Sequence, residues 1–142
     1  MHEGEMKTKR SITILTGLAA FSLIAACTPE TTPTTGRSDY ATYCADCHGA
    51  SGKGNGPAAA SLSKAPSDLT TLALRNGGTF PSLAAMGKIH GGTMGRSESA
   101  MPEFGAILDG KTVLFDAGDG IETPTPWRLV ALTKYLQSIQ QK

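Results

Sequence analysis

The chain has 142 residues, a length that suits one domain with terminal extensions. Its 13 basic and 12 acidic residues leave a formal net charge of only +1, which excludes a strongly basic nucleic-acid-binding domain. Aromatic residues make up 6% of the chain, so the side chains alone supply a thin core, while 17 glycines and 8 prolines predict long loops.

Residues 1–26 form a predicted targeting segment. A basic start is followed by an uncharged apolar run over residues 12–26, which has the length of a signal-peptide core and is short for a membrane span. Small residues directly before Cys27 resemble the bacterial lipobox, in which the cysteine is lipidated and becomes the new N-terminus. We therefore expect export and a lipid anchor on Cys27, with Met6 as a second candidate for the true start. The alternatives are plain secretion after cleavage behind Ala26 and a retained anchor helix.

Residues 27–37 are rich in Thr and Pro and have no apolar periodicity, which predicts a flexible tether. Once residues 1–26 are removed, basic and acidic residues balance, so the total charge gives no field that would steer a strongly charged partner. We expect the tether to hold the folded domain, residues 38–142, off a membrane surface.

The first predicted helix begins near Ser38 and ends near Gly49, where a glycine-rich stretch breaks it. Gly36, Tyr40 and Cys44 recur at intervals of four, so they share one helix face. A glycine on such a face leaves room for another helix to cross closely.

This helix carries the pattern C-x-x-C-H, at Cys44, Cys47 and His48, which is the attachment signature of a c-type haem. Two thiols at this spacing can bond the two vinyl groups of one haem, and the next residue is then held under the iron as a ligand. A zinc site would need a second pair of ligands, and a thiol-redox pair would need a βαβ context that the sequence does not show.

The residues from Tyr40 to Pro57 resemble the N-terminal half of the class I (mono-haem) cytochrome c family of bacteria. The resemblance lies in Tyr40-x-x-x-Cys44-x-x-Cys47-His48-Gly49 followed by Gly52-x-Gly54-x-Gly56-Pro57. It implies one covalently attached haem c on Cys44 and Cys47, with His48 as an axial iron ligand. It also implies that the second ring nitrogen of His48 donates to a backbone carbonyl at Pro57, a bond that fixes the orientation of the imidazole. A plain turn at Gly56-Pro57 is the alternative.

Two further helices are predicted over residues 66–75, capped near Asp68, and over residues 81–89. Met86 lies on the apolar side of the second helix and is expected in the core. His90 follows this helix and is an alternative sixth ligand to iron.

The stretch Met101-Pro102-Glu103-Phe104-Gly105 resembles the loop that supplies the axial methionine in the same family. A thioether sulfur is a soft, neutral donor that favours Fe(II) and so raises the reduction potential. The resemblance implies Met101 as the second axial ligand; Met94 is the alternative, and core packing is the structural explanation of Met101.

Residues 112–123 predict a small hairpin or compact loop, which is an insertion relative to short members of the family. Its acidic residues do not have the spacing of an EF-hand, so turn formation explains them better than calcium binding. The last predicted helix begins at about Pro126 and ends near Gln140 with a one-sided apolar stripe. In it Tyr135 resembles the aromatic residue that this family places at the crossing with the first helix.

Arg75, Arg96 and Trp127 are weaker candidates for contacts with the haem edge or its propionates. Ordinary surface or core placement is the alternative for each of them.

We therefore predict the all-α class and the cytochrome c fold, with three to five helices around one covalent haem and a small insertion before the last helix. The expected function is transfer of one electron between redox partner proteins on the periplasmic side of the membrane, by a monomer or by a subunit of a respiratory-type complex. The chain is expected to be a carrier and not an enzyme, and to bind no nucleic acid. The alternative is a haem enzyme or gas sensor with an open or displaceable sixth iron position.

Overall fold

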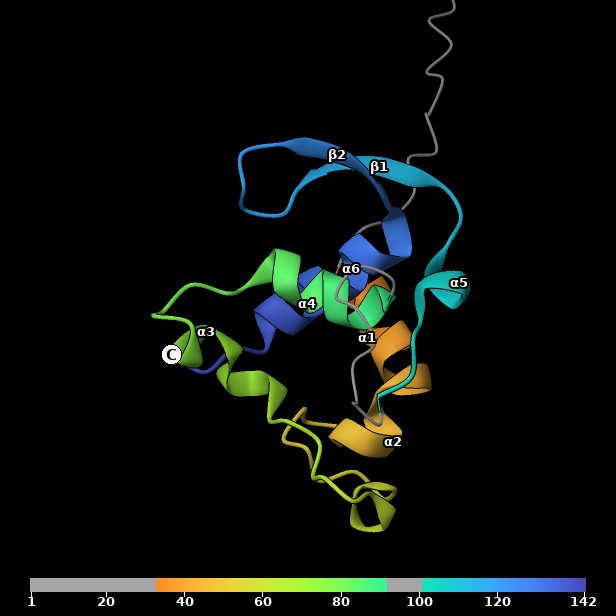
Figure 1. Cartoon of the computed structure of the whole chain (residues 1–142), viewed down its shortest axis with the longest axis vertical. Coiled ribbons are helices and arrows are strands. Elements are labelled where there is room, and N and C mark those ends of the chain that lie inside the picture. Colours follow the sequence, from red (N-terminus) through yellow and green to blue (C-terminus); the bar gives the residue numbers. More distant parts are fainter. Residues whose placement is uncertain (1–32, 92–100) are drawn as a thin grey trace, which may run out of the picture.

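The computed structural model describes residues 33–91 and 101–142. The predicted signal peptide, Cys27, Met94 and Arg96 therefore lie outside the described residues. Within them the chain forms six α-helices, two short 3-10 helices and one two-stranded antiparallel sheet (Figure 1). The helices are α1 (Pro33–Tyr43), α2 (Ala45–His48), η1 (Ala59–Ser61), η2 (Leu69–Thr71), α3 (Leu72–Arg75), α4 (Ser82–His90), α5 (Gly105–Leu108) and α6 (Trp127–Ser138). The strands are β1 (Thr112–Asp116) and β2 (Glu122–Pro126).

Helix α6 is the centre of the fold, and it contacts α1, α4, α5 and both strands (Figure 1). Its buried face contains three of the four residues of the predicted apolar stripe, and the fourth, Ile139, lies just beyond the helix and is only partly buried. The buried residues are Leu129, Val130, Ala131, Leu132, Thr133, Tyr135 and Leu136. Among the described residues no helix is both long and apolar enough to cross a bilayer.

The crossing of α1 with α6 follows the prediction. A Cβ atom on Gly36 would lie 2.0 Å from the carbonyl oxygen of Ala131, so only glycine lets the two backbones approach this closely. The rings of Tyr40 and Tyr135 pack against each other at the crossing, with centroids 5.2 Å apart. Both tyrosines are at most 8% exposed.

Helix α1 begins at Pro33, five residues before the predicted start, so it takes up the second half of the predicted tether. The proline suits the first position of a helix because its fixed φ is already helical and its missing N–H would have no partner there. Packing of Gly36 against α6 then requires helical backbone on both sides of that residue. The start of α1 therefore depends on its contact with α6, and the composition of residues 33–37 did not predict it.

The middle of the chain largely agrees with prediction. The segment predicted as one helix over residues 66–75 is divided into η2 and α3, and the Asp68 carboxylate caps η2 by accepting from the Thr70 N–H. Helix α4 ends at Gly91 in the left-handed conformation, with φ of 93°. Met86 is 7% exposed and belongs to the core, as predicted.

The predicted insertion is a β-hairpin that lies across one end of the molecule (Figure 1). Pro124 and Pro126 of β2 stand opposite Leu114 and Thr112 of β1. Proline cannot donate a ladder hydrogen bond, so these two residues restrict β2 to the edge of a sheet. The predicted all-α class is thus confirmed only in part, because a small sheet accompanies the helices, and the described residues form six α-helices where three to five were predicted.

Candidate cofactor site

Helix α2 carries the C-x-x-C-H pattern on a single turn. Cys44 is its N-cap residue, and its N–H donates to Tyr40 O at 2.9 Å, so the turn continues directly from α1. His48 is the last residue of α2, and Gly49 follows with φ of 77°, a conformation that favours glycine. Cys44, Cys47 and His48 are all half-buried, so their side chains face a partly sheltered region.

The two thiols are not joined in a disulfide. Burial raises the pKa of the Cys44 thiol to about 12, and the charges of Asp39 and Cys47 add to this effect. Cys44 is therefore a neutral thiol at neutral pH. A thiol-redox site needs the opposite shift, since its attacking cysteine acts as a thiolate. The environment of Cys44 thus argues against the thiol-redox alternative.

The imidazole of His48 is oriented by a backbone carbonyl. Its Nδ1 lies 3.0 Å from Ser67 O. A carbonyl oxygen can only accept, so Nδ1 carries the proton and Nε2 keeps the lone pair that a metal ion needs. This is the type of bond predicted for His48, but the partner is Ser67 and not Pro57.

The path of the glycine-rich segment explains why Pro57 does not take this role. The N–H groups of Gly54, Gly56 and Ala58 donate to the carbonyls of His48, Cys47 and Asp46 at 2.8, 3.0 and 2.9 Å. These bonds satisfy the free carbonyls at the end of α2 and turn the segment back along the helix. Pro57 is left on the exposed outer side.

A second proline segment takes the place predicted for Pro57. A Cβ atom on Gly54 would lie 2.2 Å from Pro66 O, so the missing side chain allows the chain around Pro66 to cover the glycine-rich segment. Leu69 N donates to Gly52 O at 2.7 Å and holds the covering chain in place. The Ser67 carbonyl lies between these two attachments.

Met101 lies on the stretch directly before α5, which adjoins the segment that carries the cysteine pair. It is half-buried and packs against the hydrophobic core. Three residues later Phe104 N donates to Ile89 O at 2.9 Å, which fixes the stretch to the end of α4. The Phe104 ring packs on Tyr43, with centroids 6.4 Å apart, and Tyr43 directly precedes Cys44. Residues far apart in sequence, the cysteine pair and the predicted methionine, thus belong to adjoining segments.

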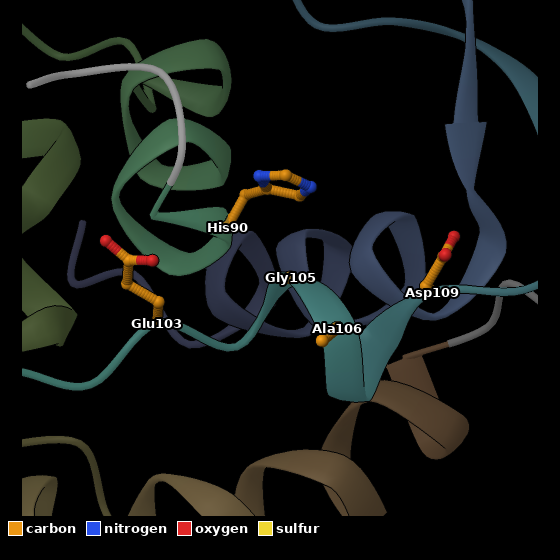
Figure 2. Close-up of a pocket in the computed structure, with 5 residues that line it drawn as sticks. All are labelled: His90, Glu103, Gly105, Ala106 and Asp109. Atoms are coloured by element: carbon orange, nitrogen blue, oxygen red, sulfur yellow. The ribbon is translucent and has the colours of Figure 1, made fainter.

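His90 is exposed and lies beside α5. It lines a cavity of about 380 Å³ together with Glu103, Gly105, Ala106 and Asp109. Figure 2 shows its ring projecting from the end of α4 over the start of α5. A Cβ atom on Gly105 would lie 3.0 Å from Nε2 of His90, so this glycine makes room for the ring. The residues that line this cavity include neither the cysteine pair nor Met101.

The weaker candidates have other partners. Arg75 Nη2 donates to Asp68 O at 2.7 Å. Trp127 is half-buried at the start of α6, where its backbone N–H donates to Lys111 O at 2.9 Å. In the hairpin, the Asp116 carboxylate accepts from the N–H groups of Gly118 and Gly120, which agrees with turn formation. Among the residues that the structure describes, no group of His, Cys, Asp and Glu has the arrangement of a metal site.

One charged pair was not predicted. Arg128 of α6 donates to both carboxylate oxygens of Asp39 in α1, at 2.6 and 3.1 Å, and also to Ile107 O at 2.8 Å. Its guanidinium lies 5.7 Å from the centre of the Tyr43 ring. The bond to Asp39 raises the pKa of Arg128, so the guanidinium stays charged. The pair connects α1, α5 and α6 just before Cys44. Its two members are 89 positions apart in sequence, so no local pattern indicates the pair.

The donor set fits a covalent haem. Two half-buried cysteines without a disulfide lie at the N-cap of α2 and within its single turn, and the next residue, His48, has Nδ1 on a carbonyl and Nε2 available to a metal ion. A soft thioether comes from the adjoining stretch at Met101.

Comparison with known families supports this assignment. A family model described as Cytochrome C oxidase, cbb3-type, subunit III matches residues 31–113, which is more than half of the chain. The match spans α1, the cysteine pair, Ser67 and Met101, and it ends within β1. Searches of curated proteins and of solved structures gave no match.

Proposed function

This chain belongs to the family described as cytochrome c oxidase, cbb3-type, subunit III, a family of class I c-type cytochromes, and from that premise we propose that it carries one electron at a time between redox partner proteins. The proposal names Cys44 and Cys47 as the covalent attachment of a single haem c, and His48 and Met101 as the axial ligands. The observation that carries it is the bond from His48 Nδ1 to Ser67 O, next to two reduced cysteines on the same turn.

Each of these residues has a distinct task in the proposed function. Bound haem supplies a one-electron couple between Fe(III) and Fe(II). Thioether bonds at Cys44 and Cys47 retain the group permanently, and the Ser67 carbonyl keeps Nε2 of His48 aimed at the iron. Met101 would supply a neutral sulfur to the iron, which would favour the reduced state and leave no position open to small ligands. Nothing in this set transfers a proton or attacks a substrate, so the proposal is a carrier.

We also propose an exported, membrane-attached protein. Support comes from the predicted signal peptide of residues 1–26 and from Cys27, which lie outside the described residues. Replacement of Cys27 by serine is expected to move the protein from the membrane fraction to the soluble fraction. Unchanged membrane association would count against lipidation.

The partner is proposed to be a membrane-bound redox protein, and the family description suggests a terminal oxidase assembly. A fixed subunit would co-purify with its partner after mild detergent extraction. A free carrier would elute as a monomer from the same preparation.

The test of the function is the optical spectrum of the reduced full-length protein, produced in a host that attaches c-type haem, before and after addition of carbon monoxide. A haem c α-band that does not change with carbon monoxide is expected for His48/Met101 ligation. Met101→Ala should make the iron accessible to the gas, whereas Met86→Leu, a change in the buried core, should not. A wild-type spectrum that shifts with carbon monoxide would favour the alternative of a ligand-binding enzyme or sensor. A protein without a haem band would overturn both.

A further inference from the structure

Gln140, which follows α6, holds the chain after Ser67. Its side-chain oxygen accepts a hydrogen bond from Ala73 N at 2.9 Å, and its nitrogen donates to Leu69 O at 2.7 Å. The same nitrogen donates to Leu136 O at 2.7 Å within α6, which fixes the rotamer of the glutamine. One side chain thus satisfies a backbone donor of α3 and a backbone acceptor of η2, across 67 and 71 residues of sequence.

Gln141 makes an adjacent attachment to Thr70. Its backbone N–H donates to Thr70 O, and its side-chain nitrogen donates to Thr70 Oγ1, both at 2.8 Å. Thr70 is only 5% exposed, and its hydroxyl donates in turn to Asp68 Oδ1 at 2.6 Å. A continuous set of hydrogen bonds therefore connects the C-terminus to the residue next to Ser67.

The chain after Ser67 is also held by the glycine-rich segment and by Arg75. Leu69 N donates to Gly52 O, and Arg75 Nη2 donates to Asp68 O, both at 2.7 Å. Ser67 itself is exposed, so its own side chain is not anchored in the core. Its position depends on the hydrogen bonds on either side of it.

We infer that Gln140 and Gln141 are positioning residues that keep the Ser67 carbonyl on His48 and thereby help to set the reduction potential. The inference rests on the proposed function, since it takes His48 as an iron ligand. A hydrogen bond from Nδ1 to a carbonyl makes the imidazole a stronger donor, and a stronger donor stabilises Fe(III). When the C-terminal hydrogen bonds are lost, the bond from His48 weakens and the potential rises.

The test compares Gln140→Ala with Gln137→Ala in the full-length haem protein. Gln137 lies three residues earlier, in the last turn of α6, and has an exposed side chain, so it is a matched control. Potentiometric titration is expected to give a higher potential for Gln140→Ala and an unchanged one for Gln137→Ala. NMR of the His48 Nδ1 proton should show faster exchange with solvent in Gln140→Ala only. Gln141→Ala keeps its backbone bond to Thr70 and should produce a smaller shift in the same direction.

Val113→Ala separates positioning from general stability, because Val113 packs on the core from the hairpin, away from η2. It should lower the unfolding midpoint without changing the potential or the exchange rate. If Gln140→Ala, like Val113→Ala, leaves the potential and the exchange rate unchanged, the inference is overturned and the proposed function stands. If Gln140→Ala yields no folded protein, an unchanged potential in Gln141→Ala overturns it equally. If His48→Ala retains the wild-type haem spectrum, the proposed function itself fails.

Discussion

The crossing of α1 with α6 and the segment of residues 49–68 are stabilised in opposite ways. Helix α6 alone buries seven residues, most of them large and apolar. In residues 49–68, the buried residues are Gly49, Gly52 and Gly56, none of which has a side chain. The crossing is held by apolar packing, whereas the segment is held by hydrogen bonds of its backbone.

This difference indicates which region needs a cofactor. Fixing the backbone of one residue costs about 1–2 kcal/mol, and a hydrogen bond returns a net of about 0.5–1.5 kcal/mol. A segment with hydrogen bonds but no buried side chains therefore has little net stability of its own. A covalently attached, largely apolar haem would supply the missing buried surface, while the helix crossing already contains its core.

The largest effect is expected when the two cysteines that attach the haem are removed. Cys44→Ser combined with Cys47→Ser should give a protein without covalently bound haem and with part of its net stability lost, out of the about 5–15 kcal/mol typical of such a domain. Haem staining after denaturing electrophoresis measures the first effect. Hydrogen exchange should show lost protection at Gly54 and Gly56, while amides of α6 remain the better protected set.

Cys27→Ser is the control for the double serine variant, because it changes a cysteine outside the haem signature and should keep the haem stain. Equal loss of protection in both regions would contradict the contrast. It would mean that the helix crossing also depends on the cofactor.

The second test disturbs the other region. Gly36→Ala places a Cβ atom against the backbone of Ala131 and should reduce the free energy of unfolding by about 2–3 kcal/mol, after allowance for the better helix propensity of alanine. Urea denaturation with far-UV circular dichroism measures this change. Ser38→Ala, at an exposed position of α1, should have almost no effect. If the two variants were equally stable, close backbone contact would not be what holds the crossing.

The crossing was predictable from sequence because its signals are local. Gly36 and Tyr40 share one helix face by their spacing of four, the resemblance to the family placed Tyr135 opposite them, and the structure brings the three together. The hairpin was predictable for the same reason, since two short strands flank a turn rich in Asp and Gly. The start of α1 was not, because the stretch before Ser38 has the composition of a linker and becomes helical through contact with α6.

The surroundings of the haem signature were less predictable because they depend on residues distant in sequence. His48 and Ser67 are 19 residues apart, and the nearer proline, Pro57, carried the only pattern that pointed to a partner. Asp39 and Arg128 are 89 residues apart and form no recognisable motif. The hydrogen bonds of Gln140 likewise depend on how the last residues pack, which no local pattern encodes.

A smaller effect is expected at the junction of the two regions. The Tyr40 hydroxyl donates to Gly49 O at 2.6 Å in a buried position, which links α1 to the glycine-rich segment. Burial raises the pKa of Tyr40 to about 12, with the charges of Cys44 and Tyr135 adding to it, so the hydroxyl stays protonated and able to donate. Tyr40→Phe leaves the carbonyl without this donor and should lower stability by about 1–2 kcal/mol.

Chemical denaturation of the haem protein measures the loss in Tyr40→Phe. Tyr135→Phe keeps an equivalent ring at the same crossing and does not touch Gly49, so it should cost less. If Tyr135→Phe were the more damaging change, the junction would depend on ring packing and not on the hydroxyl.

The smallest effect concerns Asp68, whose pKa is lowered from 3.8 chiefly by the hydrogen bonds it accepts from the Thr70 hydroxyl and backbone N–H. A lowered pKa in the folded state means that the carboxylate stabilises the fold above its unfolded pKa, and that this contribution is lost as the pH falls through the folded pKa. The difference in urea midpoint between wild type and Asp68→Asn should therefore be small but present at pH 7, decrease as the pH falls below the ordinary value of 3.8, and disappear only below the lowered pKa of the folded state.

Asp116 distinguishes a general effect of carboxylates from one linked to the haem. Backbone N–H groups of Gly118 and Gly120 lower its pKa in the same direction, but it lies in the hairpin. Asp116→Asn should therefore show the same dependence of stability on pH and leave the reduction potential unchanged. Asp68→Asn should also raise the potential slightly, because Asp68 adjoins the carbonyl that holds His48. Equal potentials in the two variants would mean that the capping of η2 by Asp68 stabilises the fold without affecting His48.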